Sequence, residues 1–552
     1  MKKPITVNFP NGESYQYEPG VTLLQISKDV KKLYTSSIVA AEVNNAIKDL
    51  QFSVTSDCTV DFLDLSTESG IKVYQRSLAF IMIAAAHELF PQGTVTVEHS
   101  LSKGLYCELH MGQPITRDHL YALEKHMKKI VGENRPITMK SVPIADAIEL
   151  FMNDGQVEKA KHLEQLNRER VRIYYCGNSY GYFYGTMMPN TGSLKVFELR
   201  QHASGFILRF PEKEQPDRLP KFVPQPKLSE IFLEAERWGE ILQCGYVATL
   251  NEYVQHNKIN EIIRVAEALH EKKIAHIADF VFQNKDVRVI LVAGPSSSGK
   301  TTFAQRLTVQ LKVNGLRPVA LSLDDYFIDR AQTPRDENGD YDFESIEAID
   351  LQLFNEHLIK ILNGEAVEVP SYNFMIGERE YHGHVIQIDK NQPLIIEGIH
   401  GLNERLSIAV PHSHKVKIYV SALTQLSIDN HNRIPTTDTR LIRRIVRDSQ
   451  FRSHDALKTL SMWSSVRRGE ERNVFPFQED ADIMFNSALI YELGVLKKYA
   501  EPLLSIITPD RVEYGEAKRL LNFLSYFENI DNHEIPLNSI LCEFTGVPSF
   551  PK

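Results

Sequence analysis

Several features that mark special classes of protein are scarce or missing in these 552 residues. The five cysteines lie far apart and form no C-x-x-C pair, which argues against a disulfide framework or a zinc site and predicts reduced thiols in a cytoplasmic protein. The longest apolar run, residues 78–86, is too short to cross a bilayer, and no apolar segment follows the basic start. We therefore expect no membrane association. Internal repeats and low-complexity segments are also missing.

Positive charge is not in excess. A net charge of −9 argues against a large nucleic-acid-binding surface, although it allows a local basic patch. The 43% hydrophobic and 24% charged residues are typical of a globular protein, and the length exceeds what one hydrophobic core supports. The composition therefore predicts an ordinary globular protein of three or four domains.

The most informative segment that is present reads Gly-Pro-Ser-Ser-Ser-Gly-Lys-Thr at residues 294–301. The apolar run 287–293 predicts a buried strand and residues 301–312 predict an amphipathic helix, which together give the context of a P-loop. Gly294 and Gly299 let backbone N–H groups point at phosphate oxygens, and the helix N-terminus attracts anions. Lys300 is expected to reach the β- and γ-phosphates, and Thr301 to offer its hydroxyl to Mg²⁺. The predicted nucleotide-binding residues are Gly294, Pro295, Ser296, Ser297, Ser298, Gly299, Lys300, Thr301 and Thr302.

Carboxylates end two further predicted strands. Residues 318–323 lead into Asp324 and Asp325, and residues 393–396 lead into Glu397. Ligands gather at the carboxyl ends of parallel strands, so these acids are expected near the phosphates. Adjacent residues of a strand point opposite ways, and we favour Asp324 as the group that accepts the proton of an attacking hydroxyl or holds Mg²⁺ through water. A capping acid at the turn is the alternative. Glu397 is expected on the magnesium side.

Arginines recur at helical spacing between residues 440 and 447. Arg440, Arg443 or Arg444, and Arg447 fall on one face of a predicted helix. A solvated basic face is one interpretation. Phosphoryl transfer needs cations over the transferred group, however, which favours a mobile arginine-bearing lid over the P-loop.

The clearest boundary is a proline-rich linker at residues 211–226. Helical residues 228–283 follow it, and from 286 to about 500 strands and helices alternate, which predicts an α/β domain with a parallel sheet covered on both faces. Residues 1–65 predict a β-grasp module, and residues 66–210 an α+β module with a helix at about 144–166. The expected divisions are 1–65, 66–210, 211–285, 286–500 and a C-terminal extension, 501–552.

Taken in order, these motifs make residues 286–500 resemble the uridine kinase family, within the phosphoribulokinase/uridine kinase group of P-loop folds. The matching stretches are 294–301, 322–327, 341–350, 369–374, 396–398 and the arginine-rich segment. The resemblance implies an ATP- and Mg²⁺-dependent nucleoside kinase with Asp324 as general base on the ribose 5′-hydroxyl. It further implies these roles: Glu344 holds ribose hydroxyls, Tyr372 lines the nucleoside pocket, Arg440 lies at the substrate, Glu397 is the magnesium-side acid, and Arg443, Arg444 and Arg447 are lid cations.

One position departs from that family. Pyrimidine kinases carry a base-contacting histidine five residues after the tyrosine, where this chain has Gly377. The resemblance therefore supports a nucleoside-type acceptor better than a particular base, and it leaves a sugar, a sugar phosphate or a pantothenate-like acceptor open.

The N-terminal half resembles threonyl-tRNA synthetase. Residues 1–65 are similar to its TGS domain and 66–210 to its second additional, editing domain, with landmarks at 10–12, 43–45, 118–127 and 188–190. The positions of the editing domain's HxxxH and CxxxH pairs hold Arg76, Phe80, Phe183 and Met187. None of these suits a metal ligand or a general base, so editing is not expected.

Three hypotheses follow for the whole chain. The first is a nucleoside kinase, the second a regulatory nucleotide-binding protein whose N-terminal half senses tRNA, threonine or another ligand, and the third a kinase gated by its N-terminal domains. A homo-oligomer is expected in each case.

Overall fold

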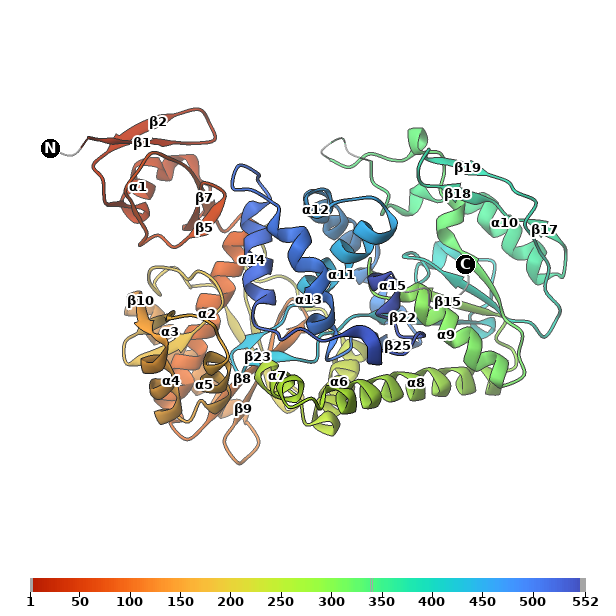
Figure 1. Cartoon of the computed structure of the whole chain (residues 1–552), viewed down its shortest axis with the longest axis horizontal. Coiled ribbons are helices and arrows are strands. Elements are labelled where there is room, and N and C mark those ends of the chain that lie inside the picture. The colour runs from red at the N-terminus through yellow and green to blue at the C-terminus, as the bar shows by residue number, and fades with distance from the viewer. Residues whose placement is uncertain (1–2, 338, 340, 547–552) are drawn as a thin grey trace.

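The computed structural model describes residues 3–337, 339 and 341–546 (Figure 1). At the N-terminus, the predicted β-grasp pattern is confirmed. One helix packs on a five-stranded sheet of order β2-β1-β7-β4-β5, in which β1 and β7 run parallel. Val7, Leu23 and Ile26 fill the core between them. The elements are β1 (Ile5–Asn8), β2 (Ser14–Tyr17), α1 (Leu23–Val30), β4 (Ile38–Val43), β5 (Ala46–Lys48) and β7 (Cys58–Asp64).

The second module has a four-stranded sheet of order β13-β14-β9-β8 and a three-stranded sheet of order β10-β11-β12. The helix expected at 144–166 is two helices, because Gly155 takes a left-handed conformation with φ 70° between them. The helices are α2 (Glu68–Leu89), α3 (Arg117–Gly132), α4 (Ile144–Asn153) and α5 (Val157–Glu164). The strands are β8 (Thr94–Leu101), β9 (Gly104–His110), β10 (Ile137–Pro143), β11 (Arg170–Cys176), β12 (Ser179–Tyr182), β13 (Glu198–His202) and β14 (Gly205–Arg209).

No helix or strand forms in the proline-rich residues 211–225. The helical stretch that follows, as predicted, divides into three helices, because Gln243 and Asn257 adopt positive φ angles of 49° and 56° at the breaks. These helices are α6 (Pro226–Leu242), α7 (Val247–Gln255) and α8 (Ile259–Gln283). Among the described residues, none of the helices is both long and apolar enough to cross a membrane.

The C-terminal α/β region is built on five parallel strands in the order β16-β21-β15-β22-β25. Apolar side chains fill both faces, with Ile290 and Val292 in one core and Val289 and Leu291 in the other. The three predicted strands are confirmed, whereas β22 and β25 were not assigned from the sequence. The strands are β15 (Val289–Ala293), β16 (Val319–Ser322), β21 (Leu394–Glu397), β22 (Lys415–Ser421) and β25 (Ile483–Asn486).

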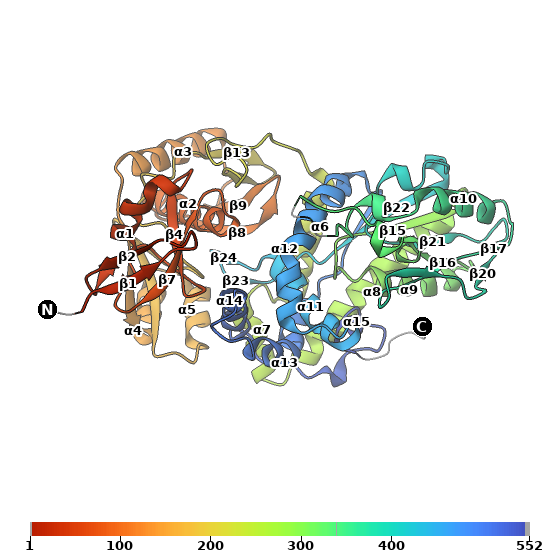
Figure 2. The ribbon, with the colours of Figure 1, turned by 90° about the horizontal axis from the view of Figure 1, so that it is seen from above.

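Figures 1 and 2 show this sheet at one end of the molecule and the N-terminal modules at the other, with α11, α13 and α14 between them. The expected boundary at 500/501 falls inside α13, and the chain after it packs into the same core as the P-loop helix. The helices of this region are α9 (Lys300–Val313), α10 (Leu351–Leu362), α11 (Thr436–Phe451), α12 (Ala456–Asn473), α13 (Glu492–Ser505), α14 (Tyr514–Leu524) and α15 (Cys542–Thr545).

Candidate active site

The phosphate loop connects the buried strand β15 to α9, as its sequence predicts. A side chain at Gly294 would place a Cβ atom 2.0 Å from the Val420 carbonyl oxygen, so only glycine fits. Gly299 has φ 83° immediately before the helix. The hydroxyls of Ser297 and Ser298 are buried without a hydrogen-bond partner among the described residues. The loop therefore presents unsatisfied polar groups beside a helix N-terminus, which suits a phosphate.

The metal side of the site pairs Thr301 with Glu397. The Thr301 hydroxyl donates to Glu397 Oε1 at 3.1 Å, while Glu397 Oε2 is buried and has no partner in the described chain. Burial raises the pKa of Glu397 to about 7, and Asp324 and Glu543 add to this rise whereas Lys300 opposes it. An unpartnered carboxylate oxygen beside a hydroxyl fits Mg²⁺, which prefers oxygen ligands and keeps several from water and phosphate.

No group of three or more histidine, cysteine, aspartate or glutamate side chains in the described ranges could hold a metal alone. A cation at Thr301 and Glu397 would therefore share its coordination with nucleotide oxygens and water.

The two adjacent aspartates have different surroundings. Asp325 Oδ1 accepts a hydrogen bond from the Tyr372 backbone N–H at 3.3 Å and so supports the loop that follows. The negative charge of Asp324 instead contributes to raising the pKa of both Glu344 and Glu397. Ser322 lies opposite Glu397 in the sheet, which brings Asp324 to the same edge. Asp324 is therefore close enough to both Glu344 and Glu397 for its charge to act on them.

Glu344, the acid predicted to hold the acceptor, lies under helix α12. Burial raises the pKa of Glu344 to about 7, and its Oε2 atom has no partner within the described residues. A Cβ atom on Gly469 of α12 would lie 2.2 Å from Glu344 Cβ, so the helix can approach only through this glycine. The Tyr372 hydroxyl is also buried and unpartnered, and its ring lies 5.5 Å from Phe327. An aromatic wall and a free carboxylate oxygen together suit a hydroxylated ligand.

The position of Gly377 is filled by an arginine from another segment. A Cβ atom on Gly377 would lie 2.7 Å from Arg330 Nε. Arg330 is held in place by its Nη2 atom, which donates to the Phe374 carbonyl at 2.6 Å, and its charge reaches Tyr372. None of the described carboxylates forms an ion pair with Arg330. The Arg330 guanidinium therefore lies beside Tyr372, at the position where pyrimidine kinases carry a base-contacting histidine.

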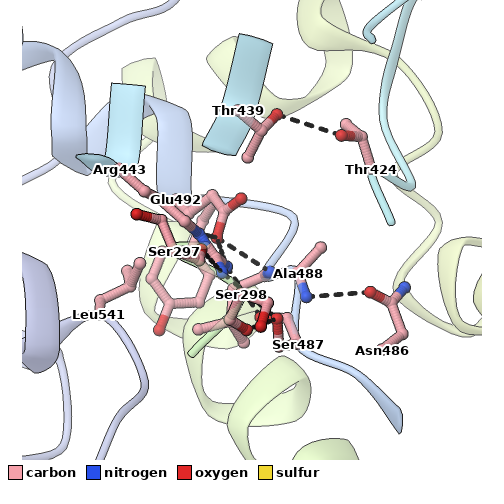
Figure 3. Close-up of polar contacts among 12 residues, drawn as sticks. Ser297, Ser298, Thr424, Thr439, Arg443, Asn486, Ser487, Ala488, Glu492 and Leu541 are labelled. Carbon is pink, nitrogen blue, oxygen red and sulfur yellow. Dashed lines mark hydrogen bonds and ion pairs between the residues drawn. The ribbon is translucent and has the colours of Figure 1, made fainter. Parts of the chain in front are cut away.

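The arginines of α11 contact the phosphate loop (Figure 3). Arg443 is fully buried and forms an ion pair with Glu492, while its Nη1 atom lies 3.4 Å from the Ser297 carbonyl oxygen. Arg440, which is 1% exposed, pairs with Glu470 and donates from Nε to the Ser296 carbonyl at 3.0 Å. Both guanidiniums thus bind the backbone of the loop.

The other two arginines of α11 are arranged differently. Arg444 Nη1 donates to the Ser296 hydroxyl at 2.7 Å, and the charge of Arg444 acts on Glu344. Arg447 pairs with Asp448 at 2.9 Å. In this structure α11 is a helix packed against the P-loop.

Several residues at the site belong to no sequence motif and were therefore not predicted. Glu470 accepts a hydrogen bond from the Ser296 N–H at 2.9 Å, and Glu492 is the partner of Arg443. Arg452 lies close enough to Asp324 and Arg447 for their charges to act on its pKa. His400 is 1% exposed, and burial lowers its pKa to about 4. His400 follows Glu397 by three residues and could have been noticed, whereas the two glutamates lie in unrelated helices.

In the second module, the residues at the editing-domain positions do meet. The rings of Phe80 and Phe183 are 5.1 Å apart, and Arg76 Nη1 donates to the Thr186 carbonyl at 2.5 Å. An arginine and two aromatic rings offer no metal ligand.

The sheet order, the phosphate loop and the acids at the strand ends define a P-loop kinase fold in the C-terminal region. Residues 289–490 match the model of the Phosphoribulokinase / Uridine kinase family. The N-terminal part is homologous to threonine–tRNA ligases. The enzyme of Francisella tularensis subsp. novicida (strain U112) is 28% identical over 202 residues, which are 37% of this chain and 32% of that ligase. The enzyme of Francisella tularensis subsp. tularensis (strain FSC 198) gives the same values. The chain thus covers about a third of the length of these relatives.

Three solved structures are similar to part of the chain. A possible uridine kinase from Bacillus stearothermophilus has 18% identity and a TM-score of 0.26, covering 38% of this chain and 97% of its own. Phosphoribulokinase from Rhodobacter spheroides has 19% identity and a TM-score of 0.26, covering 37% and 70%. D-glycerate 3-kinase from Cryptococcus neoformans has 16% identity and a TM-score of 0.21, covering 46% and 87%.

Proposed function

We propose that this protein is an ATP- and Mg²⁺-dependent phosphotransferase that phosphorylates the 5′-hydroxyl of a nucleoside. The observations that carry the proposal are that Thr301 of the phosphate loop donates to Glu397, and that Asp324 and Lys300 lie close enough to both Glu397 and Glu344 for their charges to act on these two carboxyls. A base, a cation and a metal-side acid around one phosphate loop are the parts that phosphoryl transfer requires.

In this proposal, Asp324 takes the proton of the acceptor hydroxyl while that oxygen attacks the γ-phosphorus, and ADP leaves with the bridging oxygen. Lys300 and the N–H groups of the loop bind the phosphates, and Arg444 stabilises the charge of the transition state. Glu344 holds the acceptor. Thr301 and Glu397 would hold Mg²⁺, which supplies neutralisation of phosphate charge when it is bound.

Arg330 favours a second candidate within the same class of reaction. A cation with no ion-pair partner among the described residues, next to Tyr372 and over Gly377, suits an acceptor that carries a phosphate or a carboxylate. A sugar phosphate or a pantothenate-like acid would then replace the nucleoside. The two candidates share the P-loop chemistry and differ in the charge of the acceptor.

The test is ATP turnover by the purified chain with Mg²⁺ against nucleosides, sugars, sugar phosphates and pantothenate. We expect one acceptor to yield a phosphorylated product. Replacement of Arg330 by Gln separates the candidates, since it should raise KM for an anionic acceptor about tenfold or more and change KM for a nucleoside little. ATP binding without turnover of any acceptor would contradict the kinase and favour a nucleotide-binding regulator.

A further inference from the structure

The short helix α15 near the C-terminus rests on the phosphate loop. Glu543 Oε2 accepts hydrogen bonds from the backbone N–H of Thr302 at 3.3 Å and from its hydroxyl at 2.8 Å. Thr302 is the last residue of the predicted phosphate cradle and lies in the first turn of α9. A carboxylate therefore occupies donors that, in the proposed function, face an oxygen of the nucleotide.

Glu543 has no cation among the described residues as an ion-pair partner. Its charge instead contributes to the raised pKa of another acid, Glu397. Capping the N-terminus of α9 does not by itself require Glu543 to lie near a second carboxylate, that of Glu397. Two acids and a triphosphate around the same loop would repel one another.

The residues on both sides of Glu543 cover the loop as well. A Cβ atom on Gly299 would lie 2.7 Å from Ile540 Cγ2, so the Ile540 side chain rests directly on the glycine that precedes α9. The ring of Phe544 lies 5.0 Å from the guanidinium of Arg443, which holds the other side of the loop, and Leu541 lies near the loop in Figure 3. Ile540, Leu541 and Phe544 are fully buried here.

We propose that residues 539–545 are an intramolecular inhibitor of the nucleotide site, in which the Glu543 carboxylate takes the place of a nucleotide phosphate oxygen at Thr302 and must leave before ATP binds. This inference rests on the proposed function, because it needs ATP to be the ligand of the loop. The helix N-terminus that attracts a phosphate also attracts this carboxylate, and one set of donors cannot serve both.

The part of the chain that precedes residues 539–545 contacts the N-terminal modules. Asn45 Nδ2 donates to the Pro509 carbonyl at 3.0 Å, and the hydroxyls of Tyr182 and Tyr526 are 3.0 Å apart. Residues 509 and 526 lie on the path that ends at Glu543. Release of the segment is therefore open to influence from a ligand of the N-terminal half.

The first experiment measures the Kd of ATP·Mg²⁺ for the full chain with Glu543→Ala and with Glu543→Gln. We expect binding to tighten about tenfold in Glu543→Ala, because a charge-assisted hydrogen bond is lost from the competing segment. Glu534→Gln is the matched control, since Glu534 precedes residues 539–545 and pairs with Arg264 at 3.5 Å. Its Kd should equal that of the wild type.

A second experiment needs no variant. The Cys542 thiol is buried, and burial raises its pKa to about 11, so it should react slowly with iodoacetamide. Saturating ATP·Mg²⁺ should speed alkylation of Cys542 at least severalfold, as read by peptide mass spectrometry. The other four cysteines, also buried, serve as internal references.

The outcomes separate the two proposals. If the wild type binds ATP and Glu543→Ala binds it with equal or weaker affinity, the inhibitor proposal is overturned and the proposed function is not. The same holds if saturating ATP·Mg²⁺ leaves the rate of Cys542 alkylation unchanged. Absence of ATP binding in the wild type and in Glu543→Ala overturns the inhibitor and the proposed function together.

Discussion

Asp324 and Asp325 are adjacent in the sequence but differ in what they contact. Asp325 accepts a hydrogen bond from a backbone N–H, whereas the charge of Asp324 acts on Glu344 and Glu397. We predict that Asp324→Asn lowers kcat by at least ~10²-fold, the usual contribution of a general base, with the Kd for ATP nearly unchanged. Asp325→Asn is the matched control and should lower kcat much less. Equal turnover in Asp324→Asn would remove this residue from the mechanism.

The two raised pKa values at the site give a pH dependence of stability. Glu344 and Glu397 titrate near 7 in the folded chain and at ~4.3 when unfolded. Between these values the folded state binds more protons, so deprotonation destabilises it as pH rises. We predict that the Tm of the double variant Glu344→Gln/Glu397→Gln rises relative to the Tm of the wild type as the pH is raised from 5 to 8. The measurement is made without ATP and Mg²⁺. A constant difference in Tm across that range would contradict the assignment.

At the scale of elements, the ion pair of Arg443 and Glu492 fastens α11 to α13 and to the P-loop. Both side chains are almost fully buried. Arg443→Gln leaves Glu492 as an unpaired buried acid and is expected to cost about 3–5 kcal/mol in the free energy of unfolding. The double variant Arg443→Met/Glu492→Leu should recover most of this loss in urea denaturation. If the double variant were as unstable as the single one, packing rather than charge would explain the effect.

The elements that could be predicted from the sequence are those with a local pattern. The P-loop, the strand that precedes it and the helix that follows are set by adjacent residues, and the structure confirms them. Strand β22 was missed because buried Lys415 and Lys417 interrupt its apolar pattern, and their partner Glu404 lies in another segment.

The arginines of α11 show why the site was only partly predictable. A run of charges commonly marks a solvated helix face, yet Arg440 and Arg443 are buried against acids 30 and 49 residues further along the chain. No local spacing encodes such pairs. The contact of Glu543 with Thr302, which spans 241 residues, is beyond sequence patterns for the same reason.

At the scale of the whole molecule, helix α14 connects the N-terminal modules with α11. Arg519 forms an ion pair with Asp438 at 2.6 Å, and the Tyr184 hydroxyl donates to the Arg519 carbonyl at 2.5 Å. We predict that Tyr184→Phe loosens α14 and increases the rate of Cys542 alkylation without ATP, by about two- to tenfold for one lost hydrogen bond. Tyr121→Phe, on an exposed side chain, is the control. Unchanged alkylation in Tyr184→Phe would argue against coupling through α14.

The largest core of the protein joins residues as distant in sequence as Ala147, Leu307 and Phe544. During synthesis, the phosphate loop is made more than two hundred residues before the helix that covers it. A nascent chain can therefore fold the parallel sheet and expose an uncovered loop while α15 is still unmade. Synthesis of α15 would close that interval, so the rate of translation sets how long the loop is open to nucleotide.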